Sequence, residues 1–211
     1  MLGAMLFVPA GTWQFWQGWI FLAVVFPFLL CVFLYFYKHD RPLLERRLRS
    51  KEQLSGQKRL IRLLKLVFFA IFLLPGFDYR LGWSRRLLGG AVPLWLSLMA
   101  EALILAGLLL VFWVLRANSY ASRTIEVEAG QKVISSGPYA LVRHPMYLGS
   151  LMMWLFVPLA LGSYVAWPAL ALLVPLYVYR LLNEEKFLRQ ELPGYAEYCL
   201  RTRFRLVPYV W

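Results

Sequence analysis

The stretch that decides the fold is YLGSLMMWLFVPLALGSYVAWPALALLVPLYVYRLL, residues 147–182, in which Arg180 is the only charged residue. The hydrocarbon core of a bilayer requires about 20 predominantly apolar residues of helix. Gly162 and Ser163 divide the stretch into two apolar runs. We therefore expect two antiparallel helices, Tyr147–Leu161 and Tyr164–Leu182, joined by a tight turn. The first of these is short for a full crossing.

The rest of the chain has the same apolar character. Of its 211 residues, 61% are hydrophobic and 16% are charged, whereas a soluble domain is nearer half apolar and a quarter charged. Three further apolar runs cover Trp16–Tyr37, Leu60–Phe77 and Ala91–Leu115. The sequence thus predicts an all-α integral membrane protein with about five transmembrane helices.

The distribution of basic residues predicts the orientation in the membrane. Lys and Arg number nine in segment 38–62, four in 116–147 and six in 180–211, but three in 78–90 and none before Trp16. Basic residues are enriched in cytoplasmic loops. We therefore expect a multi-pass protein with its N-terminus outside, its C-terminus in the cytoplasm, and any polar pocket facing the cytoplasm. The net charge of +12 then reflects loops near anionic lipid rather than nucleic-acid binding.

Several kinds of site are not supported. The chain has two histidines and two cysteines without HExxH or CxxC spacing, so no metal site is expected. It also lacks the glycine-rich fingerprints of dinucleotide-binding and P-loop folds. The sequence gives no indication of the oligomeric state.

Two polar clusters flank the predicted hairpin. RHPMY, residues 143–147, precedes its first helix, and RLLNEE, residues 180–185, ends its second. Because the two helices are antiparallel, we expect both clusters to lie side by side in one pocket. Simpler explanations remain open: Arg143 as a basic membrane anchor, His144 and Pro145 as a helix start, and Arg180 with Glu184 as an exposed i, i+4 pair.

Glu101 is an acidic residue inside the run Ala91–Leu115. An ionisable side chain at the centre of a membrane helix costs about 2.5–3.5 kcal/mol on insertion scales and is a functional candidate for that reason. We consider it either a substrate-binding residue or a neutral acid that joins two helices.

Three segments carry a family resemblance. GPYALVRHPMYLG (137–149), RLLNEEKFLRQELPGYAEY (180–198) and RFRLVPYVW (203–211) resemble the isoprenylcysteine carboxyl methyltransferase family, which is related to the phospholipid methyltransferases. The resemblance implies an integral-membrane methyltransferase that uses S-adenosylmethionine without a Rossmann fold. It also implies a three-span region, 1–115, followed by a methyltransferase core, 116–211.

The resemblance assigns residues to this site. The cofactor would contact Gln131, Lys132, Val133, Ile134, Gly137, Tyr139, His144, Pro145, Met146, Tyr147, Glu184 and Glu185. Arg180 would face the methyl acceptor, and Arg180, Glu184 and His144 are the candidate catalytic residues. The prenylcysteine enzymes often have His where this chain has Gln131, so a side-chain role does not transfer at that position.

The expected reaction is methyl transfer to a membrane-embedded or hydrophobic acceptor. A carboxylate, such as that of a prenylcysteine-like group, is favoured because it is already a nucleophile. A phospholipid amine, a thiol, and a lipid-binding protein without turnover are the alternatives.

Overall fold

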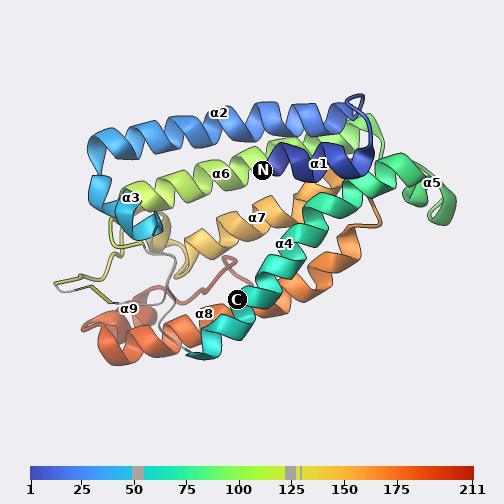
Figure 1. Ribbon diagram of the computed structural model, residues 1–211. Coiled ribbons are helices and arrows are strands. Elements are labelled where there is room, and N and C mark those ends of the chain that lie inside the picture. The colour runs from blue at the N-terminus through green and yellow to red at the C-terminus, as the bar shows by residue number, and fades with distance from the viewer. Residues whose placement is uncertain (49–54, 122–126, 129) are drawn as a thin grey trace.

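The computed structural model describes residues 1–48, 55–121, 127–128 and 130–211, with the side chains of 55–59 excepted (Figure 1). Part of the basic segment 38–62 therefore lies outside the described residues. Within the described part the chain forms α-helices and short 3-10 turns without a strand, which confirms the all-α class.

Among the described residues, three helices are long and apolar enough to cross a membrane. They are α2 (Trp16–His39), α6 (Leu94–Ala117) and the part of α4 (Ser55–Leu81) that begins at Leu60. In Figure 1, α2 and α6 run side by side, and α4 runs at an angle in front of α7 and α8. These helices match the first three predicted runs.

The last two helices differ from the prediction. Helix α7 (Pro145–Ala160) is a shorter apolar helix, as its run length indicated. Helix α8 (Leu170–Glu191) begins six residues later than expected and continues nine residues beyond Leu182. Its second half is charged, so α8 does not belong with the three long apolar helices described above. A full set of five crossings and the orientation of the chain in the membrane stay predictions.

The prediction of a two-residue turn between α7 and α8 is wrong. The chain leaves α7 at Leu161, turns at Gly162 with φ 73°, and forms a 3-10 turn η2 (Trp167–Ala169) before α8. Pro168 has no amide hydrogen, so an α-helix cannot continue through this point with its backbone bonds intact.

This connection is fixed by a buried carboxylate near the end of α4. Asp78 accepts hydrogen bonds from the backbone N–H of Ser84 at 2.7 Å and from the hydroxyl of Ser163 at 2.6 Å. It also accepts one from the hydroxyl of Ser84. Ser84 lies in the short helix α5 (Trp83–Leu87). Asp78 thus joins α4, α5 and the α7–α8 connection at the end of the molecule opposite α9.

Helices α6 and α7 cross at two glycines. A Cβ atom added to Gly107 would lie 2.7 Å from the backbone oxygen of Gly149, and one added to Gly149 would lie 2.9 Å from Val111 Cγ2. Small residues let membrane helices approach in this way. The crossing positions the start of α7, which carries Tyr147. The division at 115/116 stays a prediction, although α6 and α7 on its two sides pack closely.

The remaining helices lie toward the two ends of the molecule. Helix α1 (Leu2–Ala10) packs against the second half of α4. Helices α3 (Arg41–Leu48) and α9 (Tyr195–Arg201) lie at the opposite end of the molecule (Figure 1). There Leu192, Tyr195, Tyr198 and Cys199 form a small buried cluster against Val133 and Tyr139.

Candidate active site

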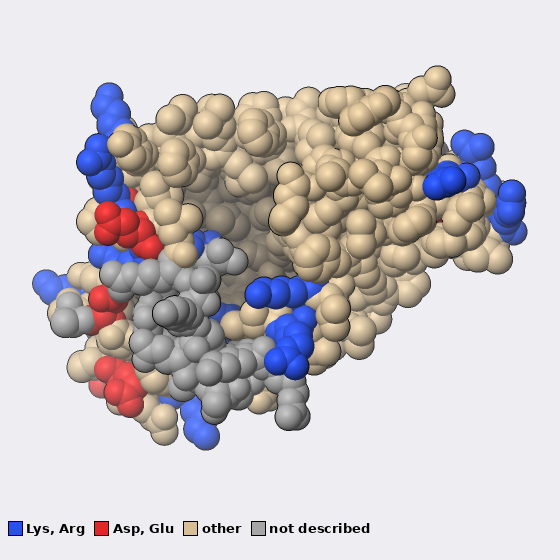
Figure 2. All heavy atoms as spheres, in the orientation of Figure 1, with Lys and Arg blue, Asp and Glu red and all other residues tan. Residues whose placement is uncertain are grey.

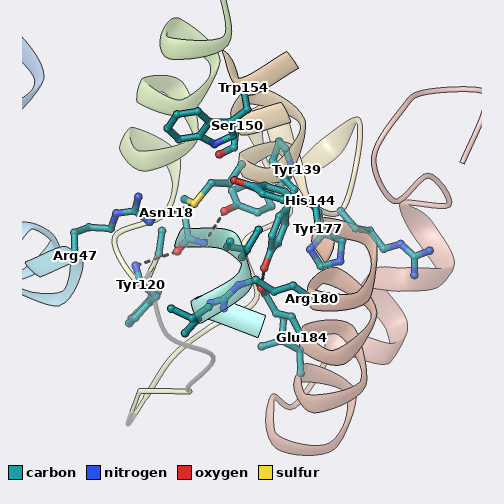
Figure 3. A pocket seen from close by; sticks show the side chains of 18 of the residues that line it. Arg47, Asn118, Tyr120, Tyr139, His144, Ser150, Trp154, Tyr177, Arg180 and Glu184 are labelled. Atoms are coloured by element: carbon teal, nitrogen blue, oxygen red, sulfur yellow. Dashed lines mark hydrogen bonds between the residues drawn. The ribbon is translucent and has the colours of Figure 1, made fainter. Parts of the chain in front are cut away.

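A cavity of about 860 Å³ lies between α3, α4, α7, α8 and the segments 118–121 and 131–134. This is within the size range of small-molecule sites, about 300–1,000 Å³. Figure 3 shows Tyr139, His144 and Arg180 gathered around it, with Trp154 at one end and Arg47 approaching from another side. Figure 2 shows a hollow in the apolar surface between the upper helices and α4, with basic side chains over α4 at its lower rim.

The structure brings the two predicted polar clusters together. The hydroxyl of Tyr147, in the first turn of α7, donates a hydrogen bond to the carboxylate of Glu184 on α8. The ring of Tyr147 also packs edge-on against Tyr177, with centroids 5.7 Å apart. Residues 37 positions apart in sequence therefore share one wall of the cavity.

Most of the predicted site residues line this cavity. They are Gln131, Lys132, Val133, Ile134, Tyr139, His144, Pro145, Met146, Tyr147, Arg180 and Glu184. Their roles in binding a cofactor or an acceptor stay predictions.

Three predicted site residues lie outside the cavity lining. Gly137 has φ 59° and turns the chain into the 3-10 helix η1 (Gly137–Ala140). Glu185 is 4% exposed and contacts Arg143 and Arg205 instead. Glu101 is 6% exposed within α6, and neither of its oxygens has a hydrogen-bond partner among the described residues. The structure thus places no cavity contact at these positions.

His144 is the most buried ionisable group of the lining. It is 4% exposed, and its backbone N–H donates to the carbonyl of Arg205 at 2.9 Å. Burial lowers the pKa of its imidazole to about 4, although the nearby Glu185 carboxylate opposes this shift. The ring is therefore neutral at pH 7. Its Nε2 atom is buried and has no hydrogen-bond partner in the described part of the chain.

Tyr139 and Asn118 form a second polar wall. The Asn118 amide donates to the Tyr139 hydroxyl at 3.0 Å, and its oxygen accepts from the backbone N–H of Tyr120 at 3.0 Å. Burial raises the pKa of Tyr139 to about 12, so this hydroxyl stays protonated at neutral pH. The phenol ring presents an aromatic face beside the cavity.

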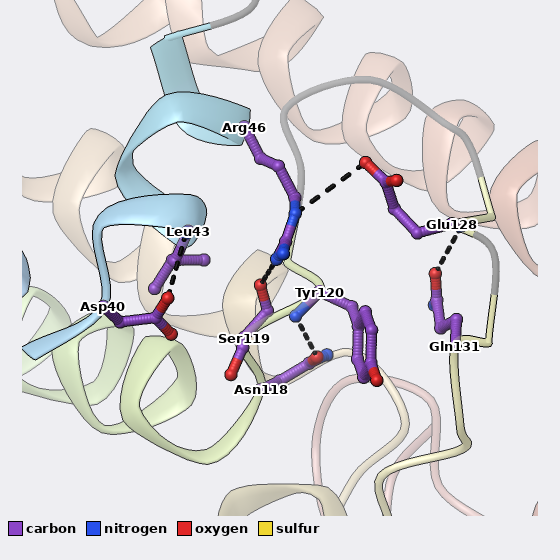
Figure 4. Close-up of polar contacts among 8 residues, drawn as sticks. All are labelled: Asp40, Leu43, Arg46, Asn118, Ser119, Tyr120, Glu128 and Gln131. Atoms are coloured by element: carbon purple, nitrogen blue, oxygen red, sulfur yellow. Dashed lines mark hydrogen bonds and ion pairs between the residues drawn. The ribbon is translucent and has the colours of Figure 1, made fainter.

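The loop that completes this wall is held by α3 (Figure 4). The Arg46 guanidinium donates to the backbone carbonyl of Ser119 and lies 3.8 Å from the Glu128 carboxylate. The side-chain oxygen of Gln131 accepts from the backbone N–H of Glu128 at 3.0 Å. Gln131 thus uses its oxygen within its own loop, at the position where the sequence departs from the prenylcysteine enzymes.

Sequence reasoning missed several lining residues: Arg47, Lys65, Phe68, Asn118, Tyr120, Ser150, Trp154 and Tyr177. Helical spacing was the available signal for some of them. Positions 147, 150 and 154 of α7, and 177, 180, 184 and 188 of α8, each follow the i, i+3, i+4 spacing of one helix face. Positions 61, 64, 65 and 68 of α4 follow the same spacing, but apolar residues on a membrane helix are equally consistent with contact to lipid.

The cavity has two chemically different parts. The described lining carries five basic side chains and one carboxylate, namely Arg47, Lys65, Lys132, Arg143, Arg180 and Glu184. One part of the cavity is apolar and follows Ile61, Leu64, Phe68 and Phe69 of α4 toward Trp154 and Leu173. Such a cavity is suited to a polar ligand at one end and a hydrophobic ligand at the other.

Comparison with known proteins gives two findings. Residues 95–193 match the family described as phospholipid methyltransferase. Over 91 residues the chain is 33% identical to the Delta(14)-sterol reductase TM7SF2 of Mus musculus, and the aligned part covers 42% of this chain and 22% of that protein. The chain thus spans about a fifth of the length of this curated relative. The family match runs from α6 to the end of α8 and leaves out α3, α4 and the C-terminal tail.

Proposed function

We propose that the chain transfers a methyl group from S-adenosylmethionine to a hydrophobic acceptor in the membrane, because residues 95–193 match the phospholipid methyltransferase family, as the resemblance predicted. The observation that carries this proposal is the two-part cavity. Its polar part includes His144, Arg180 and Glu184, and its apolar part continues along α4. A small polar cofactor and a lipid-like acceptor would meet where the two parts join.

The described residues fit this cofactor. S-adenosylmethionine has a carboxylate, an ammonium group, an adenine and a sulfonium, and when bound it supplies a methyl group by direct displacement. The Glu184 carboxylate, oriented by Tyr147, would accept hydrogen bonds from the ammonium group. The buried Nε2 of His144 has no partner among the described residues, and the ligand would provide one. Aromatic faces such as that of Tyr139 would lie near the positive charge.

The charge of the lining favours an anionic acceptor. Arg143 is paired with Glu185, and the cavity lining in the described part of the chain carries four other basic side chains and one carboxylate, so an ammonium headgroup would meet net repulsion. Arg180 would bind an acceptor carboxylate through paired hydrogen bonds. An amine or a thiol must first lose a proton, and His144, with its pKa lowered to about 4, is a poor base at pH 7. A carboxylate needs no base, so the protein has only to align it and exclude water.

The hydrophobic part of the acceptor would enter sideways from the bilayer. The apolar lining includes Leu64, Phe68 and Phe69 of α4, and Figure 2 shows a hollow in the apolar surface between α4 and the upper helices. The cofactor would arrive through the polar side, near Lys132 and the segments 118–121 and 131–134. Separate entrances would let both ligands occupy the cavity at once.

Cofactor binding tests this proposal. The purified protein in detergent is titrated with S-adenosylmethionine by calorimetry, as wild type and as the Glu184→Gln and His144→Ala variants. Loss of a charge-assisted hydrogen bond of about 1.5–3 kcal/mol predicts at least a tenfold weaker Kd for Glu184→Gln. Glu191→Gln is the matched control, because Glu191 lies on the same helix, is exposed and does not line the cavity. An absence of binding in wild type, or equal affinities of the Glu184 and Glu191 variants, would contradict the proposal.

The acceptor class is tested with methyl-labelled cofactor and three acceptors that share one alkyl chain but end in a carboxylate, an amine or a thiol. We expect label in the carboxylate product, released by mild base because it is an ester. Label only in the amine or thiol product would support methyltransferase activity but contradict a carboxylate acceptor. Cofactor binding without any labelled product would favour the alternative of a lipid-binding protein without turnover.

The relative supports a second candidate function. The name of this relative describes reduction of a sterol, and a sterol is also a hydrophobic ligand suited to the apolar part of the cavity. Incubation of the protein with host membranes and a reduced nicotinamide cofactor as hydride donor, followed by mass spectrometry of the membrane sterols, separates the two candidates. Loss of a sterol double bond without methyl transfer would favour the reductase.

A further inference from the structure

Glu185 follows Glu184 directly but faces the other side of α8. Its side chain is 5% exposed and lies against the guanidinium groups of Arg143 and Arg205, the latter at 2.8 Å. Arg189, one turn further along α8, is 3.9 Å away but itself 45% exposed, so it contributes little. A buried carboxylate therefore joins the residue before His144 to the C-terminal tail, residues 198–211.

The same tail is bonded to the cavity wall through the backbone. The N–H of Arg143 donates to the carbonyl of Phe204 at 2.9 Å, and the N–H of His144 donates to that of Arg205 at 2.9 Å. The Arg143 guanidinium also reaches the carbonyl of Arg203 at 3.3 Å. Two consecutive wall residues are thus paired with two consecutive tail residues.

The tail holds Tyr139 as well. The Tyr198 hydroxyl donates to the backbone carbonyl of Tyr139 at 2.8 Å, and the Thr202 hydroxyl lies 3.4 Å from the same oxygen. Beside these contacts, Tyr198 and Cys199 are buried in the small cluster that includes Tyr139. None of the described residues beyond Leu192 lines the cavity. The tail therefore acts on the wall from behind.

We propose that Glu185 is a positioning residue, which holds the C-terminal tail against the cavity wall through Arg143 and Arg205 and thereby fixes the orientation of Tyr139 and His144 for the cofactor. This inference rests on the proposed function and changes the role that the resemblance gave to Glu185. Without the carboxylate, Arg143 would be a buried charge lacking its partner, which is strongly unfavourable. The tail would then separate from the wall.

Two readouts test this positioning role of Glu185 without any cofactor. In a Cys31→Ser background, the buried Cys199 is the remaining thiol, and its rate of maleimide labelling reports separation of the tail. In a His39→Gln background, isotope-labelled His144 is the remaining histidine, and its imidazole NMR signals report the ring orientation. For Glu185→Gln we expect at least tenfold faster labelling of Cys199 and shifted His144 signals. Glu185→Asp should restore both in part, and Glu191→Gln should resemble wild type.

Cofactor affinity and kinetics complete the test. The Glu185→Gln variant should bind S-adenosylmethionine about tenfold more weakly, while its KM for the acceptor changes less than twofold. Should this variant fail to fold, Arg205→Gln removes the contact from the tail side, where Arg205 is 32% exposed. Unchanged Cys199 labelling, or faster labelling with unchanged His144 signals and cofactor affinity, would overturn the inference. If wild type binds no cofactor, the proposed function fails. The two cofactor-free readouts still show whether Glu185 holds the tail against the cavity wall.

Discussion

Substitution of Gly107 by Ala should destabilise the protein through the crossing of α6 and α7. The added Cβ would lie 2.7 Å from the backbone oxygen of Gly149, whereas ordinary contact begins at 3.4 Å, so the helices must separate by about 0.7 Å. Backbone on both sides leaves no flexible side chain to move aside. Overpacking of this kind costs about 1–3 kcal/mol. For a chain of this length the melting temperature should fall by roughly 2–12 °C.

Thermal unfolding in detergent, followed by tryptophan fluorescence, measures this effect. Gly90→Ala is the matched control, because an added Cβ at Gly90 meets nothing within 4 Å. Equal melting temperatures for the two variants would show that the helices do not meet at Gly107 as described. A second Cβ at Gly149 should add less than its own single effect, because both substitutions force the same separation.

Two further predictions concern the pH dependence of stability, which involves His144, and a loss of stability at Asp78 that should leave ligand binding unchanged. The pKa of His144 is about 4 in the folded chain and about 6.5 in the unfolded chain. Between pH 6.5 and 4 the unfolded chain therefore binds a proton that the folded chain does not. The free energy of unfolding falls as the pH drops through this range. Melting temperatures measured from pH 7 to 4.5 should therefore decline less steeply for His144→Gln than for wild type, and parallel slopes would contradict this. Asp78→Asn weakens the bonds to Ser84 and Ser163 and should lower stability by about 1.5–3 kcal/mol, measured by thermal unfolding. The Asp78→Asn variant should bind S-adenosylmethionine as wild type does when heating is avoided, since Asp78 does not line the cavity.

The sequence predicted the elements whose signal is local. Hydropathy located α2, α4 and α6 because a membrane span is a continuous apolar run, and it indicated that α7 is short. The start of α8 was missed because the apolar run Tyr164–Leu182 includes a connection that is apolar itself, including Trp167 and Pro168. Hydropathy does not distinguish such a connection from a helix.

The residues of the site likewise divide into those that the sequence predicted and those that only the tertiary structure reveals. Antiparallel helices brought Tyr147 and Glu184 together as expected, but sequence adjacency did not separate Glu184 from Glu185. Successive residues on a helix point about 100° apart, so only one of the two faces the cavity. The contribution of α4 depends on the tertiary arrangement, because Phe68 and Phe69 read as lipid-facing residues until a cavity is seen beside them.

The pairing of the cavity wall with the C-terminal tail has a consequence for biosynthesis. Arg143 contacts residues about 60 positions later in the chain, so its partners leave the ribosome well after α7 has been made. At about 5–20 residues per second, synthesis of that distance takes roughly 3–12 s. During this interval the wall lacks the tail that fixes Tyr139 and His144. A nascent chain should therefore complete the wall of the cavity as one of its last folding events, after its long apolar helices have been synthesised.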